Sequence, residues 1–100
     1  MAQPIYQLWR ARFTEAWYQL SQDEQRSLMA QVGEALTQVG GKSVILCMSA
    51  WADEHWQGFG VEEYPDLAAV QQHSQRLMEL NWYRYVESQS TLGTAWELPT

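Results

Sequence analysis

The sequence has little cysteine, little positive charge and no long apolar run, and each shortage excludes a class of protein. Its single cysteine, Cys47, cannot form an internal disulfide, which argues against a disulfide-stapled secreted domain. Six lysines and arginines against twelve aspartates and glutamates give a net charge of −6, which disfavours nucleic acid and anionic membrane surfaces as partners. The longest apolar run, 44–48, is far too short to span a bilayer. We therefore expect no nucleic-acid partner and no membrane partner.

Length and composition predict one folded domain. The 100 residues match the usual size of a single domain, and a hydrophobic fraction of 46% excludes disorder. We expect this domain to cover residues 1–100, with a core of about 4–94 between short tails. The first residues, Met-Ala-Gln-Pro, lack the basic and apolar regions of a signal peptide, so we expect a cytoplasmic protein.

The first half of the chain predicts a strand, a helix and a second strand. Residues 4–14 alternate between two faces, and Gln7 is the only polar residue on the otherwise apolar one. Ser21 and Glu24 have the spacing of a capping box, so a helix should begin there and end before Gly40. The apolar stretch within Ser43–Trp51 predicts a buried strand.

The second half repeats strand, helix and strand. Residues 55–63 predict a third strand, in which Gly58 and Gly60 indicate a bulge or a close backbone approach. A helix should follow Pro65, and strand-forming residues from Trp82 predict a fourth strand that ends near Gly93. The order βαββαβ predicts an α+β ferredoxin-like sandwich: a four-stranded antiparallel sheet with two helices on one face.

The sheet face opposite the helices is also expected to be apolar. Tyr6 and Leu8 of the first strand and Ile45 and Trp51 of the second should lie on it. A patch of this kind usually marks an interface, so we expect a homodimer that packs sheet against sheet into an α+β barrel. The alternative is a monomer whose open face is partly polar.

Several stretches resemble the dimeric α+β barrel superfamily, which includes antibiotic-biosynthesis-type monooxygenases and uncharacterised relatives. The stretches are Ser21-Gln22-Asp23-Glu24, Val61-Glu62-Glu63-Tyr64-Pro65-Asp66-Leu67 and Trp82-Tyr83-Arg84-Tyr85, and the resemblance covers about residues 4–94. Similar oxygenases have a cleft between sheet and helices, with an Asn on the first strand, an aromatic residue on the third and a His on the second helix. The comparable positions here are Gln7, Trp56 or Phe59, and His73, so Gln replaces Asn.

His73 and Gln7 are the candidate catalytic residues if the protein is an enzyme. His73 shares a helix face with Val70 and Leu77, so it should point toward the sheet, where it could act as a general base. Gln7 could polarise a carbonyl or an oxygen intermediate. The competing interpretation is structural: a satisfied helix histidine and a core glutamine bonded to backbone.

Six tryptophans suggest a site for an apolar ligand. Trp9, Trp56, Phe59 and Tyr64 are the expected ligand-binding aromatic residues, and Arg12 at a pocket mouth could hold a carboxylate. The alternative is that the aromatic residues fill a thin core and a dimer interface.

No metal site or cofactor is expected. Asp53, Glu54 and His55 are adjacent residues that rarely converge on one ion, and no dinucleotide or phosphate-binding motif is present. Glu62 and Glu63 are expected at a solvated strand end.

Three functions therefore remain open. The first is a dimer that binds an apolar molecule, with or without a carboxylate, in the cleft between helices and sheet. The second is a cofactor-independent monooxygenase or isomerase, and the third is a structural dimer without a ligand.

Overall fold

The computed structural model describes residues 3–99, which fold into a sheet with one layer of helices. Residues 1, 2 and 100, at the ends of the expected tails, lie outside the described residues. Four strands and two long helices follow the expected order, and two single-turn helices are inserted between them. The elements are β1 (Ile5–Phe13), α1 (Glu15–Tyr18), α2 (Gln22–Gln38), β2 (Lys42–Met48), β3 (Gly58–Tyr64), α3 (Leu67–Glu79), α4 (Trp82–Tyr85) and β4 (Val86–Gly93).

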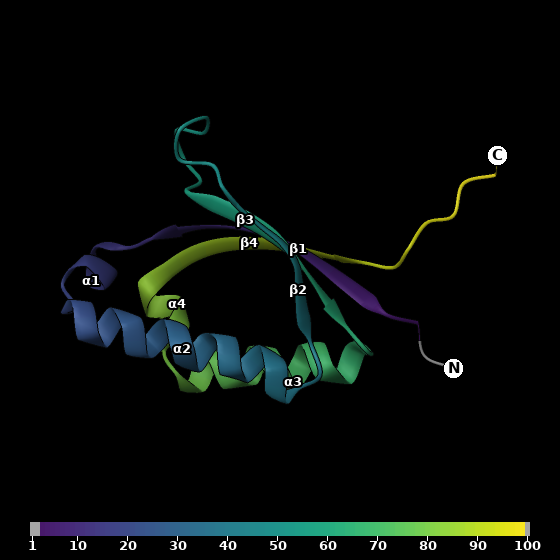
Figure 1. Cartoon of the computed structure of the whole chain (residues 1–100), viewed down its shortest axis with the longest axis horizontal. Coiled ribbons are helices and arrows are strands. Elements are labelled where there is room, and N and C mark those ends of the chain that lie inside the picture. Colours follow the sequence, from purple (N-terminus) through teal and green to yellow (C-terminus); the bar gives the residue numbers. More distant parts are fainter. Residues whose placement is uncertain (1–2, 100) are drawn as a thin grey trace.

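The sheet is antiparallel with strand order β2-β3-β1-β4, and the helices lie on one of its faces (Figure 1). This is the ferredoxin-like arrangement, so the fold predicted from the element order is confirmed. The register pairs Gln7 of β1 with Glu62 of β3 and with Leu92 of β4. These residues therefore share one sheet face, which we call the inner face because the helices cover it.

Local sequence signals set the ends of α2 as expected. Ser21 accepts a hydrogen bond from the Glu24 amide at 3.1 Å, and the Glu24 carboxylate accepts one from the Ser21 amide at 3.0 Å. The helix is followed by Gly40, whose φ of 79° is a left-handed conformation that suits glycine. The predicted capping box and stop are both confirmed.

The core lies where α2 and α3 meet one end of the sheet. It is formed by Val39, Tyr64, Ala69 and Val70, with Ile5 and Leu36 packed against it. At the other end of the helix layer, Trp17 is buried and its ring stacks on Phe13 at a centroid distance of 4.3 Å. Aromatic residues therefore fill part of a thin core, which is one of the two roles expected for them.

The fourth strand begins later than predicted. Residues 82–85 form α4 instead, and β4 begins only at Val86. Asn81 has a left-handed backbone with φ 57°, which turns the chain after α3. The amide of Thr14 then donates to the Tyr85 carbonyl at 3.0 Å, and the Thr14 hydroxyl donates to the Arg84 carbonyl at 2.7 Å. These tertiary contacts override the strand preference of the aromatic residues.

The second and third strands are also shorter than expected. β2 ends at Met48 and β3 begins at Gly58, so Trp51 lies in the connecting loop and does not lie on the open sheet face. Asp53 turns this loop by accepting bonds from the amides of His55 and Trp56 at 2.8 and 2.9 Å. The irregularity in the sheet falls in β2, between Ser43 and Ile45.

The helix layer leaves the edges of the inner face uncovered. Leu46 and Met48 of β2 pair with Gly60 and Gly58, which places both side chains on the inner face, yet they are 70% and 69% exposed. On the opposite edge, Leu92 of β4 is also exposed on this face. No helix among the described residues is long and apolar enough to cross a membrane.

Candidate functional site

A polar cluster, buried at two of its members and half-buried at the other two, occupies the space between the sheet and α3. Its four residues are Gln7 from β1, Glu62 and Tyr64 from β3, and His73 from α3. The Tyr64 hydroxyl is at the centre, 2.8 Å from Glu62 Oε1, 2.8 Å from His73 Nδ1 and 3.2 Å from Gln7 Oε1. We call these residues the Tyr64 cluster.

Strand register and helix capping bring the cluster together. Glu62 and Tyr64 are two positions apart on β3, so both side chains project to the inner face, where Glu62 is opposite Gln7. The α3 helix begins at a defined point because Asp66 accepts a bond from the Ala69 amide at 2.8 Å. One helical turn beyond Ala69, His73 is 5% exposed and faces Tyr64, which is fully buried.

The second ring nitrogen of His73 has no partner. Its Nε2 atom is buried and makes no hydrogen bond to any of residues 3–99. Such atoms are rare, because burial without a hydrogen bond costs about 1–3 kcal/mol. The hydrogen-bonding capacity of this atom is therefore unused by the described residues.

Burial controls the electrostatics of the cluster. It lowers the pKa of His73, which favours the neutral imidazole. It raises the pKa of Tyr64, and the neighbouring Glu62 carboxylate raises it further, so the phenol stays protonated. Burial also raises the pKa of Glu62, while the hydrogen bond from Tyr64 lowers it. Burial raises the pKa of Tyr83 of α4, and the nearby Glu62 carboxylate raises it further.

Three of the residues singled out from the sequence meet in this cluster: Gln7, Tyr64 and His73. Glu62 is the member that the sequence does not reveal, because the pair Glu62 and Glu63 predicts a solvated strand end. The structure corrects this assignment, since Glu62 faces inward while Glu63 pairs with Lys42 at 3.2 Å on the other face. The two-residue spacing from Tyr64 was the available signal.

The other predicted ligand-binding residues lie elsewhere. Trp9 is on the inner face, and its ring lies directly against Gly60. A Cβ atom added at Gly60 would be only 2.8 Å from the Trp9 ring. This confirms the close approach expected at this glycine. Phe59 and Arg12 project from the open face and do not reach the cluster. Trp56 precedes β3 and packs edge-on against His55 at 4.4 Å.

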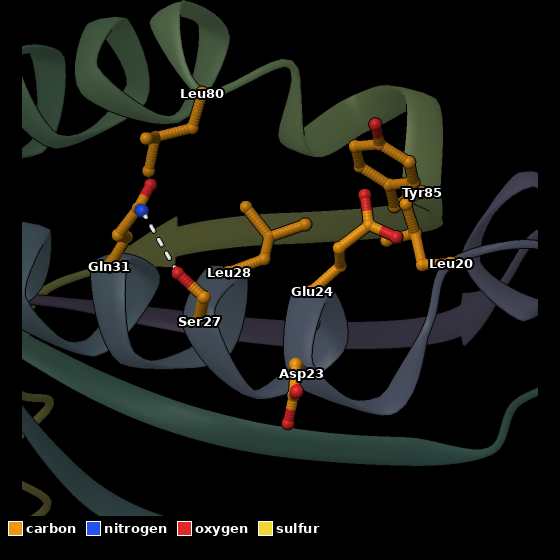
Figure 2. Close-up of a pocket in the computed structure, with 8 residues that line it drawn as sticks. All are labelled: Leu20, Asp23, Glu24, Ser27, Leu28, Gln31, Leu80 and Tyr85. Atoms are coloured by element: carbon orange, nitrogen blue, oxygen red, sulfur yellow. Dashed lines mark hydrogen bonds between the residues drawn. The ribbon is translucent and has the colours of Figure 1, made fainter.

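A shallow groove of about 380 Å³ runs between α2 and the segment that joins α3 to β4. Figure 2 shows Glu24, Leu28 and Gln31 projecting from α2 toward Leu80 and Tyr85. The remaining lining residues are Leu20, Asp23 and Ser27, so the lining combines apolar side chains with two carboxylates. No member of the Tyr64 cluster lines it.

Within residues 3–99, no three His, Cys, Asp or Glu side chains converge in a way that could hold a metal ion. A metal or cofactor here would have to use His73 Nε2 as a lone protein ligand, because its cluster partners already bond one another.

The fold class is shared with solved structures that differ in function. The chain aligns over 99% of its length with 42% of a chlorite dismutase from Candidatus Nitrospira defluvii, at 15% identity and a TM-score of 0.76. A protein of unknown function from Rhodopseudomonas palustris matches at 20% identity and a TM-score of 0.68, over 98% of this chain and 86% of that one. The cofactor-independent oxygenase SnoaB from Streptomyces nogalater matches at 14% identity and 0.58, over 97% of both chains.

These similarities confirm the α+β ferredoxin-like fold that the resemblance implies. The chain spans less than half of the chlorite dismutase, and no curated protein sequence matches it significantly. Residues 3–100 match a family model, so the chain belongs to DUF6616, a family of unknown function.

Proposed function

We propose that this protein binds a small, largely apolar molecule between the sheet and the helices, with the polar group of the molecule at His73 Nε2. One observation carries this proposal: Nε2 is buried without a partner, while Nδ1 of the same ring is held 2.8 Å from Tyr64. A ligand that pairs with Nε2 would recover the free energy that burial of this atom costs, about 1–3 kcal/mol.

The inner face supplies an apolar surface beside this polar end. Four apolar side chains lie on the same sheet face as Gln7 and Glu62: Trp9, Leu46, Met48 and Leu92. The last three belong to the edge strands β2 and β4 and are exposed. A mostly apolar wall with a few convergent polar groups is the usual composition of a small-molecule site.

Native mass spectrometry of protein purified without denaturant tests this proposal. We expect an extra small mass on the native protein that disappears on denaturation. The two histidines provide a matched pair of variants: His73→Ala should lose the extra mass, and His55→Ala, changed at an exposed residue in a loop, should keep it. Retention of the mass by His73→Ala would contradict binding at Nε2.

A second candidate function is catalysis of a proton transfer, as in a cofactor-independent monooxygenase or isomerase. Its support is the protonation state of His73, because a lowered pKa keeps the ring neutral and leaves Nε2 able to accept a proton. The resulting imidazolium would be stabilised by Tyr64 and, behind it, by the Glu62 carboxylate. The similarity in fold to SnoaB, over 97% of both chains, is consistent with this chemistry.

The substitution His73→Gln separates catalysis from binding. Glutamine can hydrogen-bond a ligand but cannot act as a base at neutral pH. If the protein is an enzyme, this variant should keep the affinity for the identified ligand within a few fold and lose turnover, measured as product formed and oxygen consumed. Equal turnover in this variant and the wild type would exclude His73 as the base.

We further propose that the protein is a homodimer formed through the open sheet face. The protein exposes 7345 Å², whereas a folded monomer of 11.6 kDa exposes about 5,800 Å². The excess of about 1,500 Å² comprises the extended segment 94–99 and uncovered sheet surface, and a stable interface takes roughly 800 Å² from each partner. The register places Leu8, Val61 and Ile45 in one row across the middle of the open face.

Sedimentation velocity tests the dimer. Ile45→Glu would place like charges in the interface and should yield a monomer. Met78→Glu also replaces an exposed apolar side chain with glutamate, but on α3, and should leave the dimer intact. A dimer that also binds no small mass would favour the third function, a structural dimer.

A further inference from the structure

The protons of the Tyr64 cluster can be assigned from its geometry. The Tyr64 hydroxyl has one hydrogen but three polar neighbours within 3.2 Å. With Glu62 ionised, the carboxylate only accepts, and a charged acceptor is preferred over a neutral one, so the hydroxyl donates to Glu62. The Tyr64 oxygen must then accept from His73, which requires the proton of the neutral ring to be on Nδ1. The unpartnered Nε2 is consequently a lone-pair acceptor.

No Lys or Arg side chain of residues 3–99 reaches the cluster. Arg10 and Arg12 project from the open face, and Lys42 pairs there with Glu63. Of the remaining three cations, Arg26 pairs with Asp23 on the exposed side of α2, Arg76 donates to Gln38, and Arg84 is exposed on α4. The only charge in the cluster is therefore the negative charge of Glu62.

We propose that this site selects a neutral ligand whose polar group is a hydrogen-bond donor, such as a phenol, alcohol or enol, and discriminates against carboxylates. This inference rests on the proposed function and narrows it. A ligand O–H can donate to Nε2. A carboxylate has no hydrogen to donate, so it could pair with Nε2 only if the ring took up a proton. Burial disfavours that proton because it lowers the pKa of His73, and no Lys or Arg side chain of residues 3–99 is there to balance the carboxylate. The carboxylate contact considered for Arg12 would have to form on the opposite sheet face.

The first test determines the tautomer without any ligand. In protein labelled with ¹⁵N-histidine, only two imidazole rings contribute, and His55→Ala assigns both. We expect His73 to show a protonated Nδ1 and a pyridine-type Nε2 at neutral pH. A protonated Nε2 would overturn the inference and leave the proposed binding site in place.

The second test compares two probes of similar size, 2-naphthol and 2-naphthoate. Titration with 2-naphthol should move the His73 Nε2 resonance saturably, while 2-naphthoate should bind at least about tenfold more weakly, which corresponds to roughly 1.4 kcal/mol. Equal or tighter binding of 2-naphthoate would overturn the inference alone. If neither probe at millimolar concentration moved the resonance, and the native mass spectrum showed no bound molecule, both the inference and the proposed function would fail.

The variant Glu62→Gln isolates the charge. It keeps a side chain of similar size at this position, so binding of 2-naphthol should change little. Removal of the negative charge should narrow the preference for 2-naphthol over 2-naphthoate by several fold. An unchanged preference would contradict the electrostatic basis of the selectivity. Glu63→Gln, at the adjacent residue on the open face, is the matched control and should leave the preference unchanged.

Discussion

Removal of one oxygen atom, by Tyr64→Phe, should destabilise the protein strongly. The phenyl ring is kept, so the fully buried side chain leaves no large cavity. The substitution deletes the bond to the Glu62 carboxylate, a bond to a charged group worth about 1.5–3 kcal/mol, and the neutral bond to His73, worth about 0.5–1.5 kcal/mol. Both hydrogen bonds meet at one hydroxyl, so their contributions are not fully additive. We therefore expect the free energy of unfolding to fall by about 2–4 kcal/mol.

Urea denaturation followed by tryptophan fluorescence measures this loss. With a slope of roughly 1.5 kcal/mol per molar urea, the midpoint should fall by about 1 to 3 M. Protein concentration must be held constant, because dimerisation makes apparent stability concentration-dependent. Tyr18→Phe is the control: it removes a hydroxyl that accepts only from Gln57 at an exposed site, so its effect should stay within about 0.5 kcal/mol.

A loss in Tyr64→Phe no greater than that in Tyr18→Phe would refute the hydrogen bonding described for the cluster. A double-mutant cycle with Glu62→Gln sharpens the test, since contacting residues in one network should show a coupling of about 0.5–3 kcal/mol. Additive effects of the two substitutions would show that the carboxylate and the hydroxyl do not interact.

Three further measurements test separate parts of the structure. Ser21→Ala removes the side-chain acceptor of the capping box and should cost about 1 kcal/mol in thermal or chemical unfolding; no loss would mean that the cap is not formed in solution. Gly33→Ala lies inside α2 with no atom within 4 Å of the added methyl group, so it should stabilise the protein by about 0.5–1 kcal/mol, and a loss would indicate an unseen contact. Burial lowers the pKa of His73 in the folded protein below its value in the unfolded chain, which is about 6.5. The resulting stability is therefore present above about pH 6.5 and is lost as the pH falls below that value toward the folded pKa, because the unfolded chain then binds more protons. His73→Gln should remove this part of the acid-induced loss, whereas His55→Ala should retain it, and identical pH profiles would contradict the burial of His73.

The fold could be predicted because local signals and topology agree. The capping box at Ser21, the glycine stop at Gly40 and the alternation in residues 5–13 depend on near neighbours in sequence, and all three appear in the structure. The start of β4 was predicted wrongly because tertiary bonds to Thr14, seventy residues away, decide the backbone at residues 82–85.

The site was predicted only in part for the same reason. Helical spacing placed His73 on the side of its helix that faces the sheet, and strand parity placed Gln7 on the inner face of the sheet. Glu62 could not be placed until the register between β1 and β3 was known, because a shift of one residue would have exchanged it with Glu63.

The pairing of Tyr6 with Gly93 places both ends of the described chain at the same end of the sheet (Figure 1). The order of the strands along the sequence could therefore be changed without changing their order in the sheet. A short linker joining the last strand to the first, with new termini opened in the exposed turn at 53–55, would give a circular permutant with the same neighbours in space. In that permutant β3, α3, α4 and β4 would precede β1, so the Tyr64 cluster would be assembled from a different sequence order.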